Sequence, residues 1–518
     1  MRVTQALVRN QQQRGQAPAT LCAGRLRTWA AFTDRVARLG AALRSLGAAD
    51  GGRVALLALN SDWYLESMYA VPWAGGIVVP LNTRWSAAEI HYALADAGVA
   101  VLVVDEHFVA LARTACEGLG KPPVLLQLGA QDSAHARGVE ALIAGHAPAV
   151  DAERSHDDIS GIFYTGGTTG RSKGVMLTHT NHVTNSVQLA AAMRMPSDCR
   201  YLHAAPMFHI ADALCIYMIT ALGGQHVVIP RFEPAACAEA IATHQISDIL
   251  LVPTMIQMLL DHLDQSPRDL PSLTRLYYGA SPIPEATLHR LFDALPGCQA
   301  TQLYGQTEAA PMITLLEGRY HVKEGPDAGR LRSAGRAMPC VEVRILDEAD
   351  QEVSRGTVGE VCARGPNVMK GYWGMEEQTA ATLRGGWLHT GDAAWMDEDG
   401  FIYITDRLKD MIISGGENVY STEVENALYQ HPAVAQCAVI GVPDPRWGER
   451  VHAVVVPKAG AARDAESIIA HCRALIADFK CPRSVEFREE PLPMSGAGKI
   501  LKTELRKPHW ESQGRAVN

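Results

Sequence analysis

Residues 164–179 read YTGGTTGRSKGVMLTH and directly follow a short apolar run at residues 159–163. Glycines carry no Cβ, so their backbone N–H groups can approach a ligand closely, and the threonine and serine hydroxyls add further donors. A loop of this kind suits phosphate oxygens. Its spacing matches neither Gly-x-x-x-x-Gly-Lys-Ser/Thr nor Gly-x-Gly-x-x-Gly, which excludes the two best-known phosphate loops.

Short runs rich in Val, Leu and Ile alternate with helical patterns on both sides of this loop. Helices are expected at residues 28–46 and 60–74, and after a capping box formed by Ser86 and Glu89. This alternation is typical of α/β proteins, in which helices cover both faces of parallel sheets. The expected strands are residues 53–59, 76–80, 99–104, 226–230, 248–253 and 275–280.

The pattern changes after about residue 335, where alternating strands are broken by Gly and Asp turns, and this predicts a small antiparallel region. Beyond Arg407 we expect a separate, small α+β unit. The boundary divides the chain into an N-terminal domain, residues 1–406, and a C-terminal domain, residues 407–518. The elements expected in the second domain are a capping box at Thr422 and Glu425, strands in AVIGV (438–442) and HAVVVP (452–457), and a helix near 465–478.

The composition is that of a soluble globular protein, with 518 residues, 47% hydrophobic and 20% charged. A formal net charge of −9 gives no general attraction to nucleic acid, so no nucleic-acid partner is expected. The eleven cysteines include no C-x-x-C pair, which fits a reducing cytoplasm and argues against a structural zinc site. We find no apolar run of about 18 residues, so neither a transmembrane segment nor secretion is expected.

Three further stretches carry residue types that act on nucleotides. LYGQTEAAP (303–311) places Glu308 after a glycine-containing turn, and GGWLHTGD (385–392) places Asp392 some fifteen residues before Arg407. GAGKILK (496–502) places Lys499 in a glycine-rich turn near the C-terminus. Together with the loop at 164–179, these stretches resemble the motifs of the AMP-forming adenylating superfamily, in family order. That superfamily includes acyl-CoA synthetases, nonribosomal adenylation domains and beetle luciferases, and the whole chain looks most like bacterial fatty-acyl-CoA synthetases.

The resemblance implies a role for each motif. Glu308 is similar to the carboxylate that binds Mg²⁺, Asp392 to the ribose ligand, and Arg407 to a second nucleotide contact. Thr165, Glu308 and Lys499 are the expected catalytic residues. The expected nucleotide site also comprises the phosphate loop (Thr165, Gly166, Gly167, Thr168, Thr169, Gly170 and Lys173), the adenine shelf (Gly279, Ala280 and Ser281) and the residues before Glu308 (Tyr304, Gly305, Gln306 and Thr307).

The chain departs from the superfamily pattern at three positions. Gly166 stands where the loop usually has Ser, Ser172 where it usually has Pro, and Ala497 where a Thr usually precedes Gly-Lys. One hydroxyl donor is lost from the phosphate loop, while the backbone donors remain.

The activity implied by the resemblance has two steps. A carboxylate attacks the α-phosphate of ATP, which gives an acyl-adenylate and pyrophosphate, and the thiol of coenzyme A then displaces AMP. In the superfamily a rotation of the mobile C-terminal domain separates these steps. Lys409 matches the hinge position, and Gly415 and Gly416 match the segment that is brought to the thiol channel.

His209 falls where the superfamily often has a residue that lines the acyl site. Between Met207 and Gly224 there is no Lys or Arg, and Asp212 is the only formal charge, so we expect an apolar monocarboxylic acid as substrate. A fatty acid is the first expectation. The alternatives are a benzoate- or hydroxycinnamate-type acid, and adenylation that loads a carrier protein. The sequence leaves the oligomeric state open, with a homodimer as one expectation.

Overall fold

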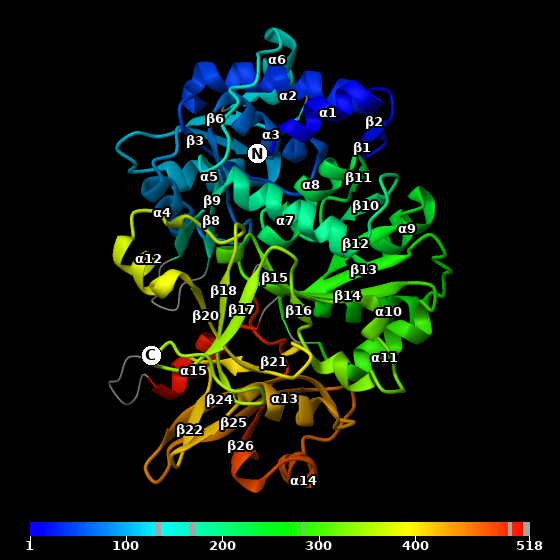
Figure 1. Cartoon of the computed structure of the whole chain (residues 1–518), viewed down its shortest axis with the longest axis vertical. Helices are drawn as coiled ribbons and strands as arrows, with labels where there is room; N and C mark the ends of the chain where they lie inside the picture. Colours follow the sequence, from blue (N-terminus) through cyan, green and yellow to red (C-terminus); the bar gives the residue numbers. More distant parts are fainter. Residues whose placement is uncertain (130–135, 166–171, 282, 496–499, 511–518) are drawn as a thin grey trace.

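The computed structural model describes residues 1–129, 136–165, 172–281, 283–495 and 500–510. A large N-terminal domain of mixed sheets lies above a smaller C-terminal domain (Figure 1). The predicted α/β fold class is confirmed. None of the described helices combines the length and the apolar character that a membrane span requires.

One large sheet is built around the strand that precedes the phosphate loop. Its order is β19-β9-β8-β4-β3-β5-β6-β7, and β8 and β9 form an antiparallel hairpin beside the parallel strands. The bounds of these strands, in sequence order, are β3 Arg53–Leu57, β4 Ile77–Pro80, β5 Val101–Val104, β6 Val124–Gln127, β7 Arg137–Gly138, β8 Ile159–Thr165, β9 Lys173–Thr178 and β19 Gly371–Tyr372.

The second large sheet has the order β16-β15-β14-β13-β12-β10-β11-β1-β2. Its central strands are parallel, and antiparallel strands flank them at both edges. The bounds are β1 Pro18–Cys22, β2 Arg25–Thr28, β10 Arg200–His203, β11 Gln225–Val228, β12 Asp248–Leu251, β13 Arg275–Gly279, β14 Gln299–Gly305, β15 Met312–Leu316 and β16 Arg336–Ala337.

Side-chain alternation along β3 shows why helices cover both faces of its sheet. Val54 and Leu56 point into one apolar core together with residues of α2, α3 and α8, whereas Ala55 and Leu57 point into another with residues of α4 and α5. The bounds of the N-terminal helices are α1 Gln5–Arg14, α2 Trp29–Leu43, α3 Asp62–Ala74, α4 Ala87–Ala97, α5 Val109–Cys116, α6 Val139–Gly145, α7 His179–Ala192, α8 Ile210–Leu222, α9 Pro234–His244, α10 Pro253–Gln265, α11 Glu285–Ala294 and α12 Glu376–Thr382.

The predicted antiparallel region is confirmed as a sheet of order β17-β18-β20-β21. The C-terminal domain has its own sheet of order β23-β22-β25-β24, with β26 parallel to β25. The bounds are β17 Glu342–Leu346, β18 Gly359–Arg364, β20 Leu388–Met396, β21 Ile402–Arg407, β22 Ile412–Ser414, β23 Glu417–Val419, β24 Val434–Asp444, β25 Gly448–Pro457 and β26 Ser484–Phe487.

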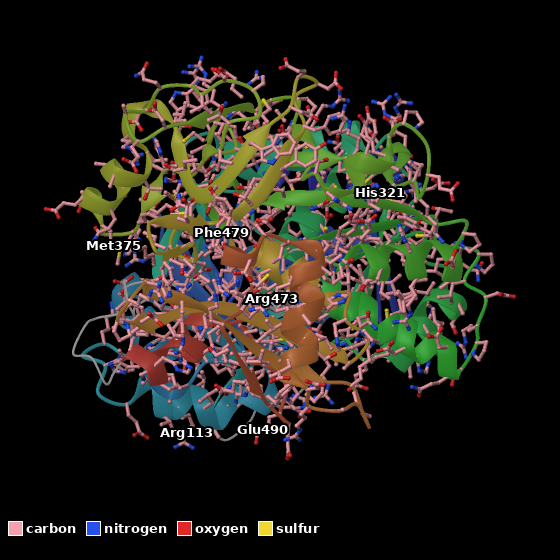
Figure 2. All side chains as sticks on the ribbon, turned by 90° about the horizontal axis from the view of Figure 1, so that it is seen from below. Arg113, His321, Met375, Arg473, Phe479 and Glu490 are labelled. Carbon is pink, nitrogen blue, oxygen red and sulfur yellow. The ribbon has the colours of Figure 1, made fainter. Side chains whose placement is uncertain are left out.

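Helices also cover both faces of the C-terminal sheet. α13 (Ser421–Tyr429) and α14 (Ala465–Leu475) pack on one face, and α15 (Lys502–Trp510) packs on the other through Leu505. Figure 2, seen from below, shows α14 with Arg473 and, close to it, the half-exposed Phe479.

Two capping boxes were predicted, and the structure confirms one of them. At α4 the Ser86 hydroxyl accepts from the Glu89 N–H while the Glu89 carboxylate accepts from the Ser86 N–H. The box at Thr422 and Glu425 is wrong, because α13 begins at Ser421 and its N-cap, Tyr420, makes no side-chain cap. The Glu425 carboxylate instead accepts from the Val439 N–H at 2.8 Å and pairs with Lys502 Nζ at 2.7 Å.

Candidate active site

The ends of the predicted phosphate loop face each other across the β8–β9 hairpin, where Thr165 pairs with Lys173. The Lys173 ammonium lies 4.9 Å from the ring centroid of Tyr372, which reaches the site from the neighbouring strand β19. The loop residues between them, Gly166, Gly167, Thr168, Thr169 and Gly170, lie outside the described residues.

Glu308 lies in a one-turn helix, Thr307–Ala309, directly after β14. Its carboxylate Oε1 accepts a hydrogen bond from the Tyr372 hydroxyl at 2.8 Å. Burial, and then the nearby Glu308 charge, raise the pKa of Tyr372, so the phenol stays protonated as the donor. Tyr372 therefore connects the base of the phosphate loop to the predicted magnesium carboxylate.

The backbone around Glu308 is tightly fixed. The Gln306 N–H donates to the Pro311 carbonyl at 3.0 Å. Gly305 has no room for a side chain, since a Cβ there would lie 1.8 Å from the Pro311 oxygen. The buried amides of Asn185 and Asn367 both donate to the Ala309 carbonyl, at 2.8 Å and 3.0 Å. This turn is therefore preorganised by residues from distant parts of the chain.

Asp392 and Arg407 are brought together as directly paired residues of β20 and β21. Arg407 Nε lies 3.0 Å from Asp392 Oδ1, and the Tyr304 hydroxyl donates to Asp392 Oδ2 at 2.8 Å. The Asp392 charge, more than any other cause, raises the pKa of Arg407, and the charge of Glu308 contributes a smaller effect in the same direction. The residues that are predicted to bind ribose, magnesium and the nucleotide therefore interact electrostatically with one another.

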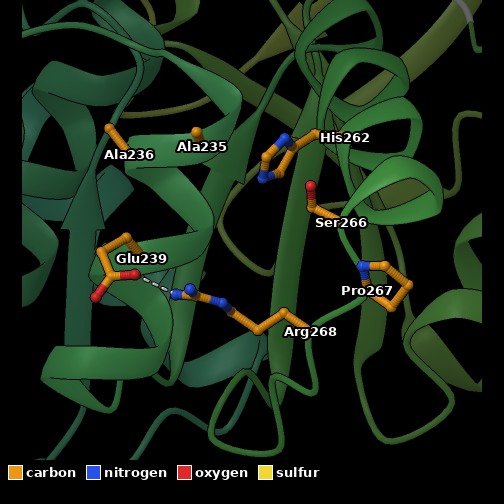
Figure 3. Close-up of a pocket in the computed structure, with 7 residues that line it drawn as sticks. All are labelled: Ala235, Ala236, Glu239, His262, Ser266, Pro267 and Arg268. Atoms are coloured by element: carbon orange, nitrogen blue, oxygen red, sulfur yellow. Dashed lines mark hydrogen bonds and ion pairs between the residues drawn. The ribbon is translucent and has the colours of Figure 1, made fainter.

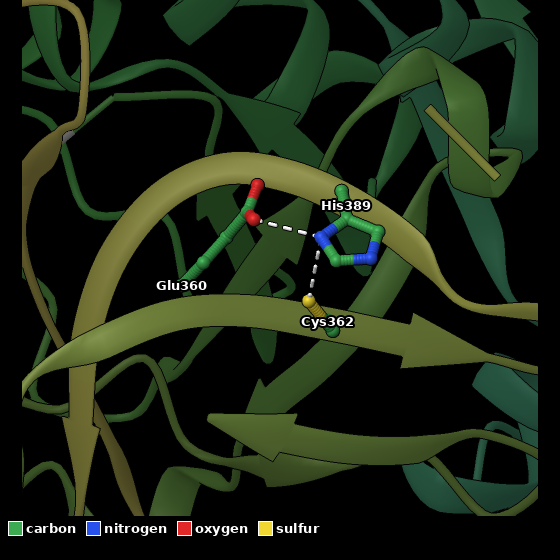
Figure 4. A group of neighbouring side chains, drawn as sticks. All are labelled: Glu360, Cys362 and His389. Atoms are coloured by element: carbon green, nitrogen blue, oxygen red, sulfur yellow. Dashed lines mark hydrogen bonds and ion pairs between the residues drawn. The ribbon is translucent and has the colours of Figure 1, made fainter. Parts of the chain in front are cut away.

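A second layer of side chains holds the Asp392 strand in place (Figure 4). Glu360 on β18 accepts from the Gly391 N–H at 2.8 Å and lies 2.7 Å from His389 Nδ1. The Cys362 thiol lies 3.3 Å from the same nitrogen, and burial raises its pKa to about 12, so it remains a thiol. Glu360 thereby fixes the backbone immediately before Asp392.

The predicted adenine shelf lies at the end of β13, beside the strand that leads to Glu308. Gly279 pairs with Leu303, and a Cβ on Gly279 would lie 2.1 Å from the Leu303 carbonyl oxygen. Ala280 follows in the left-handed region, with φ of 68°. Together with Ser281, these residues expose backbone rather than bulky side chains toward the end of the strand.

His209 is the N-cap of α8, and its Nδ1 lies 3.3 Å from the Ala211 N–H. Its neighbours Met207 and Ile210 share an apolar core with Ala310, which follows the Glu308 turn. Asp212 is fully buried and already satisfied, because it accepts from the Tyr201 hydroxyl at 2.8 Å and pairs with His203 Nδ1 at 2.7 Å. The single formally charged side chain of this segment is therefore hydrogen-bonded inside the protein.

The predicted hinge and thiol-channel residues lie in the C-terminal part. Lys409 follows β21, burial lowers its pKa, and its carbonyl accepts from Arg506 of α15 at 3.1 Å. Gly415 and Gly416 form the turn between β22 and β23, with φ of 63° and 86°. Lys499 lies outside the described residues.

A surface recess between α9 and α10 lies apart from this group (Figure 3). Glu239 and Arg268 form an ion pair across it, and His262 lines one side. Its lining includes none of the predicted site residues.

Sequence reasoning missed the residues that support the site. Tyr372, Asn367 and Glu360 lie 64, 58 and 31 residues from their partners Glu308, Ala309 and Gly391 in the sequence. No local pattern joins such partners. The one available signal was the pair of aromatic residues, Tyr372 and Trp373, that follows Gly371.

Comparison with known proteins gives a consistent result. A family model described as AMP-binding enzyme matches residues 7–373, and one described as AMP-binding enzyme C-terminal domain matches residues 423–499. A feruloyl-CoA synthase of an Amycolatopsis species is 41% identical over 507 residues, covering 96% of this chain and 97% of that protein. A medium/long-chain fatty-acid–CoA ligase of Mycobacterium tuberculosis is 39% identical, covering 94% and 86% of the two chains. The crystal structure of ATP-bound MatB from Rhodopseudomonas palustris superposes with a TM-score of 0.88 at 31% identity, covering 98% and 99%.

Proposed function

Because the chain belongs to the family of AMP-binding enzymes, as an AMP-forming acid–CoA ligase, we propose that it couples an apolar monocarboxylic acid to coenzyme A in two steps that use ATP. One observation supports this most strongly. Lys173, Tyr372 and Glu308 form a continuous chain of contacts, and Glu308 closely follows strand β14, whose Tyr304 reaches Asp392. These contacts support the proposal that the phosphate-, metal- and ribose-binding groups form one site.

The nucleotide would be bound by residues of the N-terminal domain. Asp392 uses one lone pair on each carboxylate oxygen for Tyr304 and Arg407, which leaves others to accept from ribose hydroxyls. Gly279 and its neighbours provide a shelf without bulky side chains for adenine. Lys173 and Thr165, at the two ends of the phosphate loop, would contact the β- and γ-phosphates.

Glu308 fits a magnesium ion, because a fixed carboxylate is the hard oxygen ligand that Mg²⁺ prefers. When bound, Mg²⁺ supplies positive charge that neutralises phosphate oxygens. Tyr372 orients the carboxylate through one oxygen, and a carboxylate has further acceptor sites for the ion.

The chemistry begins when the substrate carboxylate oxygen attacks the α-phosphorus of ATP and pyrophosphate leaves. Lys499 would stabilise the negative charge on the α-phosphate oxygens in this step. The coenzyme A thiol then attacks the acyl carbon, and AMP leaves with the electron pair of the acyl–oxygen bond. For this second step we infer that the C-terminal domain, residues 407–518, rotates about Lys409 and presents Gly415 and Gly416 to the thiol.

The acid is proposed to bind beside His209 and the first turn of α8. Asp212 is buried and held by Tyr201 and His203, and no Lys or Arg lies between Met207 and Gly224, so this segment offers no cation for a second carboxylate. Fatty acids and hydroxycinnamates are the two candidate classes. The first was expected from the sequence, and the second is equally supported by the similarity to a feruloyl-CoA synthase.

The test is an AMP-release assay with coenzyme A over fatty, hydroxycinnamic, benzoic and dicarboxylic acids. We expect apolar monocarboxylates to exceed dicarboxylates by at least about tenfold in kcat/KM, because burying an unpaired carboxylate costs several kcal/mol. A preference for malonate or succinate would refute the proposed substrate class. A phosphopantetheinyl carrier protein replaces coenzyme A in a parallel assay, and activity with the carrier alone would favour a carrier-loading enzyme.

A further inference from the structure

Three side chains with metal-binding atoms meet in the C-terminal domain and take no part in the reaction described above. They are His452 on β25, Glu486 on β26 and His509 on α15, and one ligand atom from each lies within 4.8 Å of the others. Glu486 Oε2 is 3.7 Å from His452 Nε2 and 3.9 Å from His509 Nε2. The two imidazole rings are 5.0 Å apart, between centroids.

Sheet register explains why these residues meet. β25 and β26 are parallel, His452 pairs with Ser484 and Val454 pairs with Glu486, so His452 and Glu486 point to the same face. Val454 packs on that face against Leu505 of α15, and this contact places the end of the helix, with His509, over the two strands.

The His452 ring is held in one orientation and is incompletely satisfied. Its Nδ1 lies 2.7 Å from the Ser484 hydroxyl oxygen, whereas its buried Nε2 has no hydrogen-bond partner among the described residues. The residue is only 6% exposed, so water does not freely satisfy this nitrogen. A buried polar atom without a partner is costly. The tautomer that donates from Nδ1 to Ser484 leaves the Nε2 lone pair available, 3.7 Å from Glu486 Oε2.

We propose that His452, Glu486 and His509 bind one divalent transition-metal ion of the Zn²⁺, Co²⁺ or Ni²⁺ type. Bonds of about 2.0–2.1 Å in a tetrahedral site place ligand atoms roughly 3.3–3.5 Å apart. The two distances to Glu486, 3.7 and 3.9 Å, need to contract by only a few tenths of an ångström. The ligand atoms of the two histidines, which lie within 4.8 Å of each other, need to approach by at most about 1.5 Å. Two imidazoles and one carboxylate suit these ions, whereas Mg²⁺ prefers oxygen ligands. Ser484 supplies the outer hydrogen bond that metal-binding histidines usually make.

The other described group of this kind, around His389, is different. There His389 Nδ1 already lies 2.7 Å from Glu360 Oε2, and Glu360 Oε1 already accepts from the Gly391 N–H. Those atoms satisfy one another, so the group needs no ion.

An ion at His452, Glu486 and His509 would tie α15 to two strands of the C-terminal sheet. α15 also carries Lys502, which pairs with Glu425 at 2.7 Å, and Arg506, which pairs with Asp410 at 3.1 Å. The ion would therefore strengthen the attachment of the last helix, and binding to the native state alone raises the temperature of unfolding.

The test uses the full-length, tag-free, metal-stripped protein, because a polyhistidine tag binds the same ions. Co²⁺ is added without nucleotide, and its ligand-field absorption, its stoichiometry and the thermal midpoint are recorded. We expect one Co²⁺ per chain with a spectrum typical of nitrogen ligands, and a higher thermal midpoint. Glu486→Gln and His509→Asn should each lower Co²⁺ affinity by at least about tenfold.

The matched control is the double variant His431→Asn with His471→Asn. It removes two imidazoles whose rings are 5.2 Å apart in the same domain, and it should bind Co²⁺ as the parent protein does. The proposal is overturned if the Glu486→Gln, His509→Asn double variant keeps the parent affinity and spectrum, or if the control loses as much affinity as that variant.

Discussion

At the scale of single residues, one phenol connects two parts of the proposed ATP site. Tyr372→Phe keeps the ring beneath Lys173 and removes only the hydrogen bond to Glu308. We expect kcat to fall about tenfold, since a hydrogen bond to a charged group contributes about 1.5–3 kcal/mol. Glu308→Gln should lower kcat by roughly 10² or more, because it removes the carboxylate that we propose holds the metal.

Both variants are measured by AMP release at saturating Mg²⁺. Tyr429→Phe serves as the control, because that hydroxyl contacts Cys437 and lies in the C-terminal domain. An unchanged kcat in Glu308→Gln would remove Glu308 from the site.

His182 gives a residue-level prediction about pH. The ring is fully buried, neither nitrogen has a hydrogen-bond partner in the described part of the chain, and burial lowers its pKa to about 3. The His182 imidazole takes up a proton near pH 6.5 in the unfolded chain but not in the native chain. The contribution of the neutral ring to the free energy of unfolding is therefore fully present above pH 6.5 and is lost as pH falls toward 3. Within this range the free energy of unfolding falls by about 1.4 kcal/mol per pH unit.

His182→Phe should therefore show a shallower decline of the thermal midpoint between pH 7.5 and pH 5.5 than the parent protein. Parallel curves for the parent and for His182→Phe would show that His182 does not contribute to acid sensitivity.

At the scale of elements, the one-turn helix that carries Glu308 depends on amides from elsewhere in the chain. Asn367 is fully buried and donates to the carbonyls of Ala309 and Met312, at 3.0 Å and 2.8 Å. Asn367→Ala removes one of the two amide donors to the Ala309 carbonyl, where Asn185 remains, and the amide donor to the Met312 carbonyl. Each lost hydrogen bond costs about 0.5–1.5 kcal/mol, and the turn loosens. We expect the Mg²⁺ concentration for half-maximal rate to rise at least about fivefold, on the same hydrogen-bond scale.

The measurement is an Mg²⁺ titration of AMP release, with the exposed Asn426→Ala as control. If the Mg²⁺ requirement of Asn367→Ala equalled that of the control, the turn would not depend on this amide.

Helices, strands and helix caps could be predicted from the sequence where the residues that stabilise them are neighbours in the chain. Val54 to Leu57 form a strand because every residue is apolar and both faces are buried, and the Ser86 cap needs only Glu89, three residues away. The Thr-x-x-Glu pattern at Thr422 wrongly predicted a capping box, because the Glu425 carboxylate accepts a hydrogen bond from Val439 and pairs with Lys502, and both are distant in sequence. The motifs single out Glu308, Asp392 and Arg407 as site residues, which stays a prediction. Tyr372 and Asn367 match no local pattern, because their partners Glu308 and Ala309 are distant in sequence.

At the scale of the whole molecule, the proposed rotation assigns the two half-reactions to different parts of the C-terminal domain. Lys499→Ala should lower acyl-adenylate formation by roughly 10² to 10³ and leave thioester formation from synthetic acyl-adenylate near the parent rate. Gly416→Trp should do the reverse. A Cβ at Gly416 meets no atom within 4 Å, so the indole would project into the space that the thiol is proposed to use.

The two rates are measured separately, as pyrophosphate release without coenzyme A and as thioester formation from adenylate. Gly400→Trp is a control at another glycine of positive φ, 82°, whose Cβ would also meet no atom. Equal damage to both half-reactions in Lys499→Ala would refute the rotation.

The central claim is that the acid is activated as an acyl-adenylate. It is tested most directly by turnover of a preferred acid labelled with ¹⁸O in its carboxylate, followed by mass spectrometry of the phosphate-containing products. Attack of the carboxylate on the α-phosphorus predicts AMP that carries one ¹⁸O atom and pyrophosphate that carries none. Unlabelled AMP, or ¹⁸O in inorganic phosphate formed together with ADP, would contradict it.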